Sequence, residues 1–263
     1  MENGDGKRLR ERLTIPHLPR SAAYDPRWMI EDVMGPNPLW PLEELIGRMG
    51  LRPGMRVLDL GCGKAMTSVF LARECGVQVW AADLWIDPTD DLRRIAEAGC
   101  ADRVVPLRVQ ARELPFAHGY FDAVVSVDAY HYFGTDDFYP GCLADFIRPG
   151  GMLGVTVPGV RAEIERVPGH LRPWWQWEFM SLHTLAWWRR HWELTGKVRV
   201  LEAWEPEEGW RLWRTWCEVC AEAAADETVR EASRREAETL EADAGRTFTF
   251  VHLVAETTAP AGP

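Results

Sequence analysis

Two glycines and one carboxylate mark a stretch of the sequence that could bind a charged ligand. Gly61 and Gly63 follow the short apolar run 57–60, and Asp59 lies two residues before the first glycine. A glycine turn between a strand and a helix exposes backbone N–H groups to a ligand. A carboxylate in that turn would repel a pyrophosphate, but it suits a ligand that carries an amine and a sulfonium. The pattern therefore favours S-adenosylmethionine over NAD, although Asp59 could also serve only as a helix cap or turn acceptor.

The dinucleotide fingerprint fails on a second count. It needs a third small residue three positions after the second glycine, and Met66 stands there. A second acidic residue, Asp83, ends the apolar run 77–83, 24 positions after Asp59. A carboxylate at the tip of a second strand can accept hydrogen bonds from both hydroxyls of a ribose. Leu84 follows directly and could flank an adenine, whereas the alternative for Asp83 is a capping role.

The elements that must position these residues alternate along the chain, which is typical of an α/β fold. After the glycine turn, apolar spacing predicts a helix from Met66. Further strands are expected at 103–109, 121–127 and 152–157, with helices at 91–98 and 136–146 between them. The second half predicts a strand at 198–204, two helices from 207 to 243 and a last strand at 247–254. Residues 1–20 are expected to be a mobile arm with at most one helical turn.

Five ordered segments between residues 55 and 157 resemble the class I S-adenosylmethionine-dependent methyltransferases, within their type-11 group. Residues 57–65 resemble motif I of that family, with Ala65 in place of the last glycine. Residues 110–116 resemble the G-D-A-x-x-L-P-F segment, and 148–151 match its Arg-Pro-Gly-Gly turn. The resemblance implies a doubly wound, seven-stranded, mostly parallel, Rossmann-like sheet that binds S-adenosylmethionine.

The resemblance also implies which residues bind the cofactor. Gln110 stands where the family usually has an acidic residue that accepts the adenine amino group, and a Gln carbonyl can accept the same bond. The backbone N–H of Ala111 could reach the ring. The full set of expected cofactor contacts is Asp59, Gly61, Gly63, Asp83, Leu84, Gln110, Ala111 and Ser126.

Residues 128–133 follow the fourth expected strand, where a doubly wound sheet binds its ligands. Methyl transfer needs alignment of nucleophile and methyl group and, for some acceptors, removal of a proton. His131 is the candidate base, with a structural histidine as the alternative. Tyr130 and Tyr132 could orient the substrate or only pack, and Asp128 could hold the substrate or the methionyl end of the cofactor.

The remainder of the chain is rich in tryptophan, with 14 in all. Insertions usually cover the carboxyl edge of such a sheet, so an aromatic helical lid is expected, although a secondary core is the alternative for most tryptophans. Tyr132, His170, Trp174, Trp175 and His183 are the substrate-pocket candidates. The predicted segments are an arm with cap helices at 1–50, the cofactor-binding core at 51–158, an aromatic insertion at 159–196, and C-terminal strands at 197–263 with a helical insertion at about 207–244.

Composition limits the partners. A formal charge of −10 argues against nucleic acid. No apolar run approaches the roughly 18 residues of a membrane span, and the N-terminus lacks an apolar signal segment, so a cytoplasmic protein without stable membrane association is expected. The scattered cysteines predict reduced thiols and no metal site. The sequence leaves open whether the protein forms a homodimer.

We therefore expect an enzyme that methylates an O, N or C atom of a small molecule. One alternative is a relative of the cyclopropane synthases that acts on lipid acyl chains. The other is a regulatory domain that binds S-adenosylmethionine without catalysis.

Overall fold

The computed structural model describes residues 4–258, so the outermost ends of the first and last predicted segments, 1–3 and 259–263, lie outside the described residues. The described part contains a seven-stranded sheet in the order β3-β2-β1-β4-β5-β7-β6. Its strands are β1 (Arg56–Leu60), β2 (Gln78–Asp83), β3 (Val104–Arg108), β4 (Phe121–Val127), β5 (Ile147–Val160), β6 (Val198–Trp204) and β7 (Phe248–Thr257). Strand β7 runs antiparallel to both of its neighbours, whereas the other pairs are parallel. The expected doubly wound, mostly parallel sheet is confirmed.

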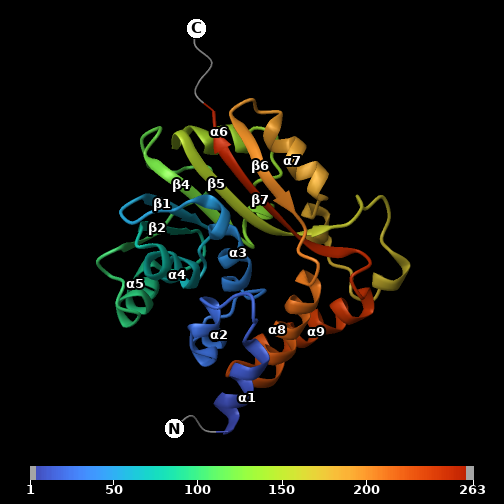
Figure 1. Cartoon of the computed structure of the whole chain (residues 1–263). Helices are drawn as coiled ribbons and strands as arrows, with labels where there is room; N and C mark the ends of the chain where they lie inside the picture. Colours follow the sequence, from blue (N-terminus) through green and yellow to red (C-terminus); the bar gives the residue numbers. More distant parts are fainter. Residues whose placement is uncertain (1–3, 259–263) are drawn as a thin grey trace.

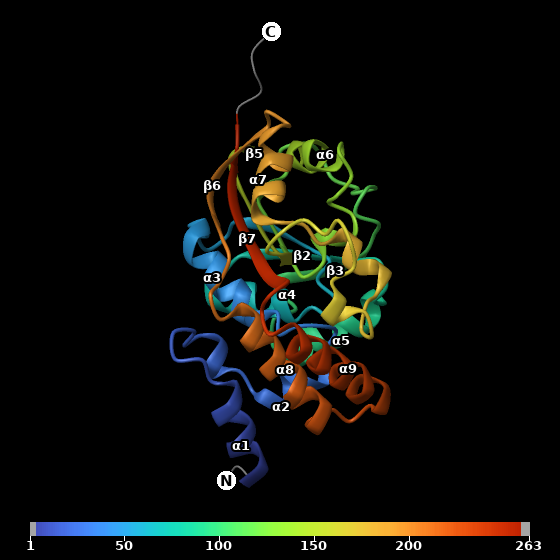
Figure 2. The same cartoon turned by 90° about the vertical axis from the view of Figure 1, so that its right-hand side faces the viewer.

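Side chains alternate between two apolar layers, one on each face of the sheet. In β1, Val57 joins the layer of helices α3 (Leu39–Met49) and α4 (Met66–Cys75), whereas Leu58 joins the opposite layer. The opposite layer contains α6 (Tyr139–Asp145) and α7 (Leu185–Glu193), and Figure 2 shows these helices across the sheet from α3. Helix α5 (Pro88–Glu97) connects β2 to β3. This sandwich holds the carboxyl ends of the parallel strands at one edge.

Three further helices lie beyond that edge. Figure 1 shows α2 (Pro26–Glu31), α8 (Gly209–Ala223) and α9 (Glu227–Asp243) at the end of the sheet opposite the arrowhead of the antiparallel strand β7. The pair α8–α9 separates β6 from β7 in the sequence, as the periodicity of 207–243 predicts. On α8, Trp213, Trp216 and Cys217 are buried on one face. The carboxyl edge is therefore flanked by helices from both ends of the chain.

The N-terminal segment corrects one expectation. Residues 4–13 form a full helix, α1 (Gly4–Leu13), instead of a mobile arm. Leu9 and Leu13 are buried, and Arg12 contacts Glu222 at the end of α8 at 2.7 Å. The charged residues of this segment lie on its exposed side, and two leucines four positions apart are enough to dock it.

The aromatic insertion forms little regular structure before α7. Strand β5 extends to Val160, and the chain then makes two 3₁₀ turns, η3 (Gly169–Leu171) and η4 (Trp177–Ser181). On α7, Trp188 and Trp192 are fully buried against the sheet, which fits the expectation of a secondary core. Within residues 4–258, no helix combines the length and the apolar character needed to cross a membrane.

Candidate functional site

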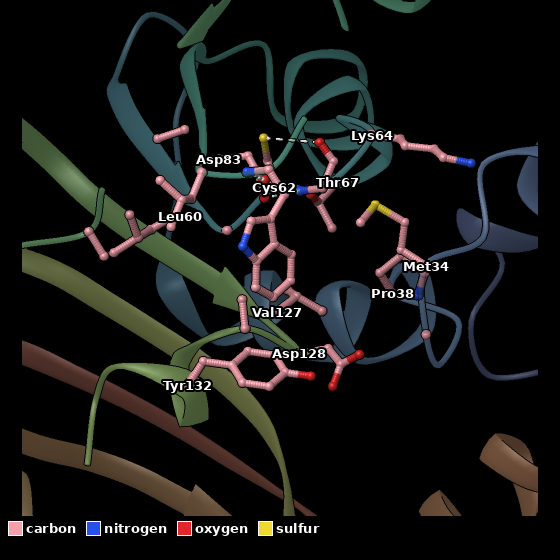
Figure 3. Close-up of a pocket in the computed structure, with 18 of the residues that line it drawn as sticks. Met34, Pro38, Leu60, Cys62, Lys64, Thr67, Asp83, Val127, Asp128 and Tyr132 are labelled. Atoms are coloured by element: carbon pink, nitrogen blue, oxygen red, sulfur yellow. Dashed lines mark hydrogen bonds between the residues drawn. The ribbon is translucent and has the colours of Figure 1, made fainter. Parts of the chain in front are cut away.

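A cavity of about 300 Å³ lies at the carboxyl edge, over the ends of β1, β2 and β4. Figure 3 shows its two ends, with Asp83, Cys62 and Thr67 on one side and Asp128 and Tyr132 on the other. We name the first the glycine-turn end, which comprises Gly61, Gly63, Asp83, Leu84, Gln110 and Ala111. We name the second the loop end, which comprises Met34, Gly35, Asp128, Tyr132 and Phe133.

The turn after β1 takes a backbone conformation that glycine favours. Gly61 and Gly63 have φ angles of +77° and +54°, and Ala65 has 62°. A Cβ atom on Gly61 would lie 2.3 Å from the Cβ atom of Ala129. The first glycine therefore allows the close approach of the loop after β4, whereas Ala65 tolerates a left-handed conformation where the family motif has glycine.

Asp83 ties this turn to the end of β2. Its Oδ2 atom accepts a hydrogen bond from the backbone N–H of Gly63 at 2.9 Å. Its Oδ1 atom accepts from the N–H groups of Trp85 at 2.7 Å and Ile86 at 3.2 Å. The carboxylate is 8% exposed and lines the cavity. It can accept further hydrogen bonds from a ribose, because each carboxylate oxygen has more than one lone pair.

Asp59 lies behind the turn, outside the cavity wall. Its Oδ2 atom accepts hydrogen bonds from the hydroxyls of Thr67 and Ser68, both at 2.6 Å, and its Oδ1 atom has no partner. Burial raises the pKa of Asp59 to about 6, and the bonds from Ser68 and Thr67 offset only part of this rise. Asp59 therefore anchors the first turn of α4 and does not line the cavity.

Of the remaining candidates for cofactor contact, some line the cavity and one does not. Leu84, Gln110 and Ala111 line the cavity, as expected. Trp85 also lines it and is 65% exposed, so a broad ring stands free beside the space. Ser126 does not reach the cavity, because it is fully buried and its hydroxyl donates to the carbonyl of Leu60 at 2.7 Å. Its expected contact is replaced by a bond between β4 and β1.

The loop end combines two segments that are far apart in the sequence. The loop between α2 and α3 contributes Met34 and Gly35, and the turn after β4 contributes Asp128 and Tyr132. The Sδ atom of Met34 would lie 2.8 Å from a Cβ atom on Gly63, so this loop closes over the glycine turn. Helix α8 holds it, because the indole Nε1 of Trp216 donates to the carbonyl of Gly35 at 2.8 Å.

Two of the catalytic candidates turn away from the cavity. Residues 130–132 form the 3₁₀ turn η2 (Tyr130–Tyr132), in which neighbouring side chains point in different directions. Tyr130 is fully buried against Trp188 and Trp192. His131 is 5% exposed, and burial lowers its pKa to about 4. Neither lines the cavity, so of the residues predicted in this turn Asp128 and Tyr132 line it, and their catalytic role stays a prediction.

The candidates in the aromatic insertion have local partners instead. His170 contacts Asp243 at 3.0 Å, and His183 contacts Glu163 at 2.9 Å. Trp175 packs against Phe179 in a separate apolar cluster with β7 and α9. These residues and Trp174 do not line the cavity. After β5 the chain runs toward α9 and the first residues of β7, away from the cavity. The expectation that they form the substrate pocket is therefore wrong for this cavity.

Sequence reasoning did not single out Met34 and Gly35, in the loop between α2 and α3. Its signal is the run Gly35-Pro36-Asn37-Pro38, which interrupts two helices just before the first strand. Further cavity residues that were not singled out follow the glycine turn or lie on the adjoining segments: Asp32, Cys62, Lys64, Thr67 and Arg112.

Comparison with known proteins agrees with this geometry. The family model of a methyltransferase domain matches residues 57–151. An uncharacterized protein of Mycobacterium tuberculosis is 30% identical over 187 residues, which is 70% of this chain and 65% of that protein. The 27-O-demethylrifamycin SV methyltransferase of Amycolatopsis mediterranei is 31% identical over 135 residues, covering 48% of this chain and 49% of the enzyme.

A solved structure extends the likeness of fold. Phosphoethanolamine N-methyltransferase 2 of Haemonchus contortus, in complex with S-adenosyl-L-methionine, superposes with a TM-score of 0.72 at 20% identity. The match covers 95% of this chain and 60% of that one. The chain spans less than two thirds of the length of the curated relatives that it matches. Residues 57–151 match a methyltransferase domain, which supports the expected resemblance to the class I S-adenosylmethionine-dependent methyltransferases.

Proposed function

We propose that this protein transfers a methyl group from S-adenosylmethionine to an O, N or C atom of a small molecule that enters at the loop end. The observation that carries the proposal is the division of one cavity into two chemically different ends. The glycine-turn end offers backbone and carboxylate groups suited to a nucleoside with a cationic side chain. The loop end leaves aromatic and acidic side chains for a second molecule.

The residues at the glycine-turn end fit the cofactor. Asp83 would accept hydrogen bonds from the ribose hydroxyls, and Leu84 and Ala111 would flank the adenine. The methionyl part of the cofactor would lie along the backbone of Gly61 and Gly63, because neither residue has a Cβ atom to fill that space. S-adenosylmethionine supplies an activated methyl carbon, so the protein needs mainly to align the two reactants and exclude water.

Met34, Asp128 and Tyr132 border the space left for the acceptor. Met34 shields the cofactor from solvent by closing over Gly63. Asp128 and Tyr132 orient the attacking atom and can hold its proton. His131 is not needed as a base, because it does not line the cavity and burial lowers its pKa to about 4, which makes it a weak proton acceptor.

Calorimetry with S-adenosylmethionine, S-adenosylhomocysteine and NAD tests the first half of the proposal. Both sulfur compounds should bind, and NAD should not. Asp83→Ala should weaken binding by about 1–3 kcal/mol, as the loss of a charged acceptor does. Asp87→Ala is the matched control, because Asp87 caps α5 in the same loop and lies outside the cavity, so affinity should not change.

Mass spectrometry of products tests the second half. A panel of small molecules is incubated with protein and methyl-labelled cofactor, and labelled product is expected from at least one acceptor. Tight cofactor binding without any labelled product would favour the regulatory alternative. A preference for NAD would reject the proposal altogether.

A further inference from the structure

The charged side chains of the cavity differ in whether they have partners. Four of the five are satisfied within the protein: Asp32 by Arg94 at 3.1 Å, Lys64 by the carbonyl of Glu31 at 3.1 Å, Arg112 by Asp136 at 3.3 Å, and Asp83 by three backbone N–H groups. Asp128 is the exception. Across residues 4–258, its carboxylate makes neither a hydrogen bond nor an ion pair with any side chain or backbone group.

The backbone turns Asp128 toward the open space. Its φ angle of 55° is left-handed and follows directly on β4. Figure 3 shows the carboxylate projecting into the cavity beside the phenol of Tyr132. The wall behind it is Gly35, where a Cβ atom would lie 2.6 Å from Oδ2. The free side of the carboxylate is therefore the side that faces the cavity.

A second carboxylate, that of Glu236 on α9 in the helical insertion, adds negative charge near Asp128. Glu236 on α9 accepts hydrogen bonds from the indole Nε1 of Trp213 at 3.0 Å and from the thiol of Cys217 at 3.4 Å. Burial raises the pKa of Asp128 well above its usual value, and the charge of Glu236 raises it further. Burial, Asp128 and Glu236 also raise the pKa of Tyr132 to about 12.

Such an arrangement is costly unless a cation joins it. Asp128 is half-buried and has no charged partner among residues 4–258, so a cation at contact distance would offset the cost of withdrawing its carboxylate from water. Asp32 and Arg112 are neutralised by Arg94 and Asp136, so the remaining charged residues of the cavity are Lys64, Asp83 and Asp128, and Glu236 adds a further carboxylate near Asp128. One bound cofactor, whose sulfonium and ammonium outnumber its single carboxylate, does not balance the whole. An aromatic ring beside a carboxylate is also a favourable surface for an ammonium group.

We propose that Asp128 selects a cationic acceptor, an alkyl- or arylamine whose ammonium group binds between its carboxylate and the ring of Tyr132. This inference rests on the proposed methyltransferase function and names the class of its acceptor. It makes N-methylation the reaction of the loop end.

The step balances with the groups at hand. The ammonium gives one proton to the Asp128 carboxylate, which leaves a neutral amine with a free lone pair. The amine nitrogen forms a bond to the methyl carbon, and the bond between that carbon and sulfur breaks with its electron pair staying on sulfur. The positive charge passes from sulfur to nitrogen, and S-adenosylhomocysteine leaves as a neutral thioether.

The test measures binding of amine and alcohol pairs to the protein saturated with S-adenosylhomocysteine. The pairs are benzylamine and benzyl alcohol, 2-phenylethylamine and 2-phenylethanol, and hexylamine and 1-hexanol. Calorimetry should give at least tenfold tighter binding of an amine than of its alcohol. Asp128→Asn should remove that preference and leave the affinity for S-adenosylhomocysteine within about twofold. Asn tolerates a left-handed backbone, so this variant should fold.

Asp136→Asn is the control, because Asp136 carries the same charge near the cavity but is paired with Arg112 and does not line the space. It should keep the preference for amines. The inference is wrong if no amine binds more tightly than its alcohol, or if Asp128→Asn keeps the preference. A variant that loses S-adenosylhomocysteine instead would assign Asp128 to the cofactor. Failure of the unaltered protein to bind S-adenosylhomocysteine would reject the proposed function itself.

Discussion

The two ends of the cavity are built from different kinds of contact. At the glycine-turn end, residues from the ends of β1 and β2 bond one another: the backbone N–H of Gly61 donates to the carbonyl of Ala82, and that of Gly63 donates to the carboxylate of Asp83. At the loop end, two loops meet that are almost a hundred residues apart, and a tryptophan from α8 holds one of them. The first end is set by the sheet, whereas the second depends on the whole chain.

This difference separates what must stay constant from what can vary. Backbone groups at the ends of parallel strands have fixed positions, so they suit a ligand that every member of a family shares. Side chains on loops change without disturbing the sheet, so they suit a ligand that differs between members. Three predictions sharpen or break this division.

The largest effect is expected at Asp59, which supports the glycine-turn end. Its pKa is raised to about 6 from an ordinary value of 3.8, so its stabilising effect is present below pH 3.8 and is lost as the pH rises through 6. Relative to Asp59→Asn, the unaltered protein should lose about 2 kcal/mol of unfolding free energy between pH 4 and pH 7.5. Urea denaturation at both pH values measures it.

Asp122→Asn is the comparison variant, for which the opposite dependence of stability on pH is expected. Burial acts to raise the pKa of Asp122, but hydrogen bonds from Arg56 and Arg148 outweigh it and lower the pKa. Relative to this variant, the unaltered protein should therefore gain stability as the pH rises from the acid side. Equal slopes for both variants would show that burial does not govern Asp59.

A smaller effect is expected from Gly61→Ala. The left-handed backbone costs about 1–3 kcal/mol for a residue with a side chain, and the added Cβ atom would meet Ala129. Affinity for S-adenosylhomocysteine, measured by calorimetry, should fall at least about tenfold. Gly99→Ala is the matched control, because Gly99 has a similar φ angle of +68° and nothing within 4 Å of the added atom. If both variants bind equally well, the turn is not a ligand site.

The smallest effect on the cofactor is expected from Gly35→Ala at the loop end. The added Cβ atom would meet only the Oδ2 atom of Asp128, which is the movable end of a side chain. Affinity for S-adenosylhomocysteine should change by no more than about 0.5 kcal/mol, again by calorimetry. A loss as large as that of Gly61→Ala would mean that the two ends form one binding surface, and the division would fail.

The sequence predicted the glycine-turn end well for a physical reason. Strand period, glycine turns and an acidic residue at a strand tip are local signals, and they located Gly61, Gly63 and Asp83 on the cavity. Leu84 followed from its place directly after Asp83, whereas Gln110 and Ala111 followed from the family resemblance. Of the residues predicted to contact the cofactor, only Asp59 and Ser126 do not line the cavity. A sequence does not distinguish a buried polar side chain that bonds a neighbouring element from an exposed one.

The loop end could not be predicted in the same way. Residues 128–133 were correctly placed near the site, but which of them face it depends on the φ angle of Asp128 and on the 3₁₀ turn that follows. These local features turn Tyr132 outward and bury Tyr130 and His131. Met34 and Gly35 reach the cavity in a loop whose Gly35 carbonyl accepts a hydrogen bond from Trp216 on α8, and the sequence carries no periodic signal for this long-range contact.

The indole of Trp216 links α8 directly to the loop between α2 and α3, and α9 packs against α8. Because these two helices interrupt the chain between β6 and β7, they can be exchanged as a cassette without cutting the parallel part of the sheet. In a chimera that receives the helices of a relative, the loop between α2 and α3 should change position at the loop end. The glycine-turn end should stay unchanged. Directed evolution of acceptor range in this scaffold should therefore begin in the helical cassette, at a distance from the reacting atoms.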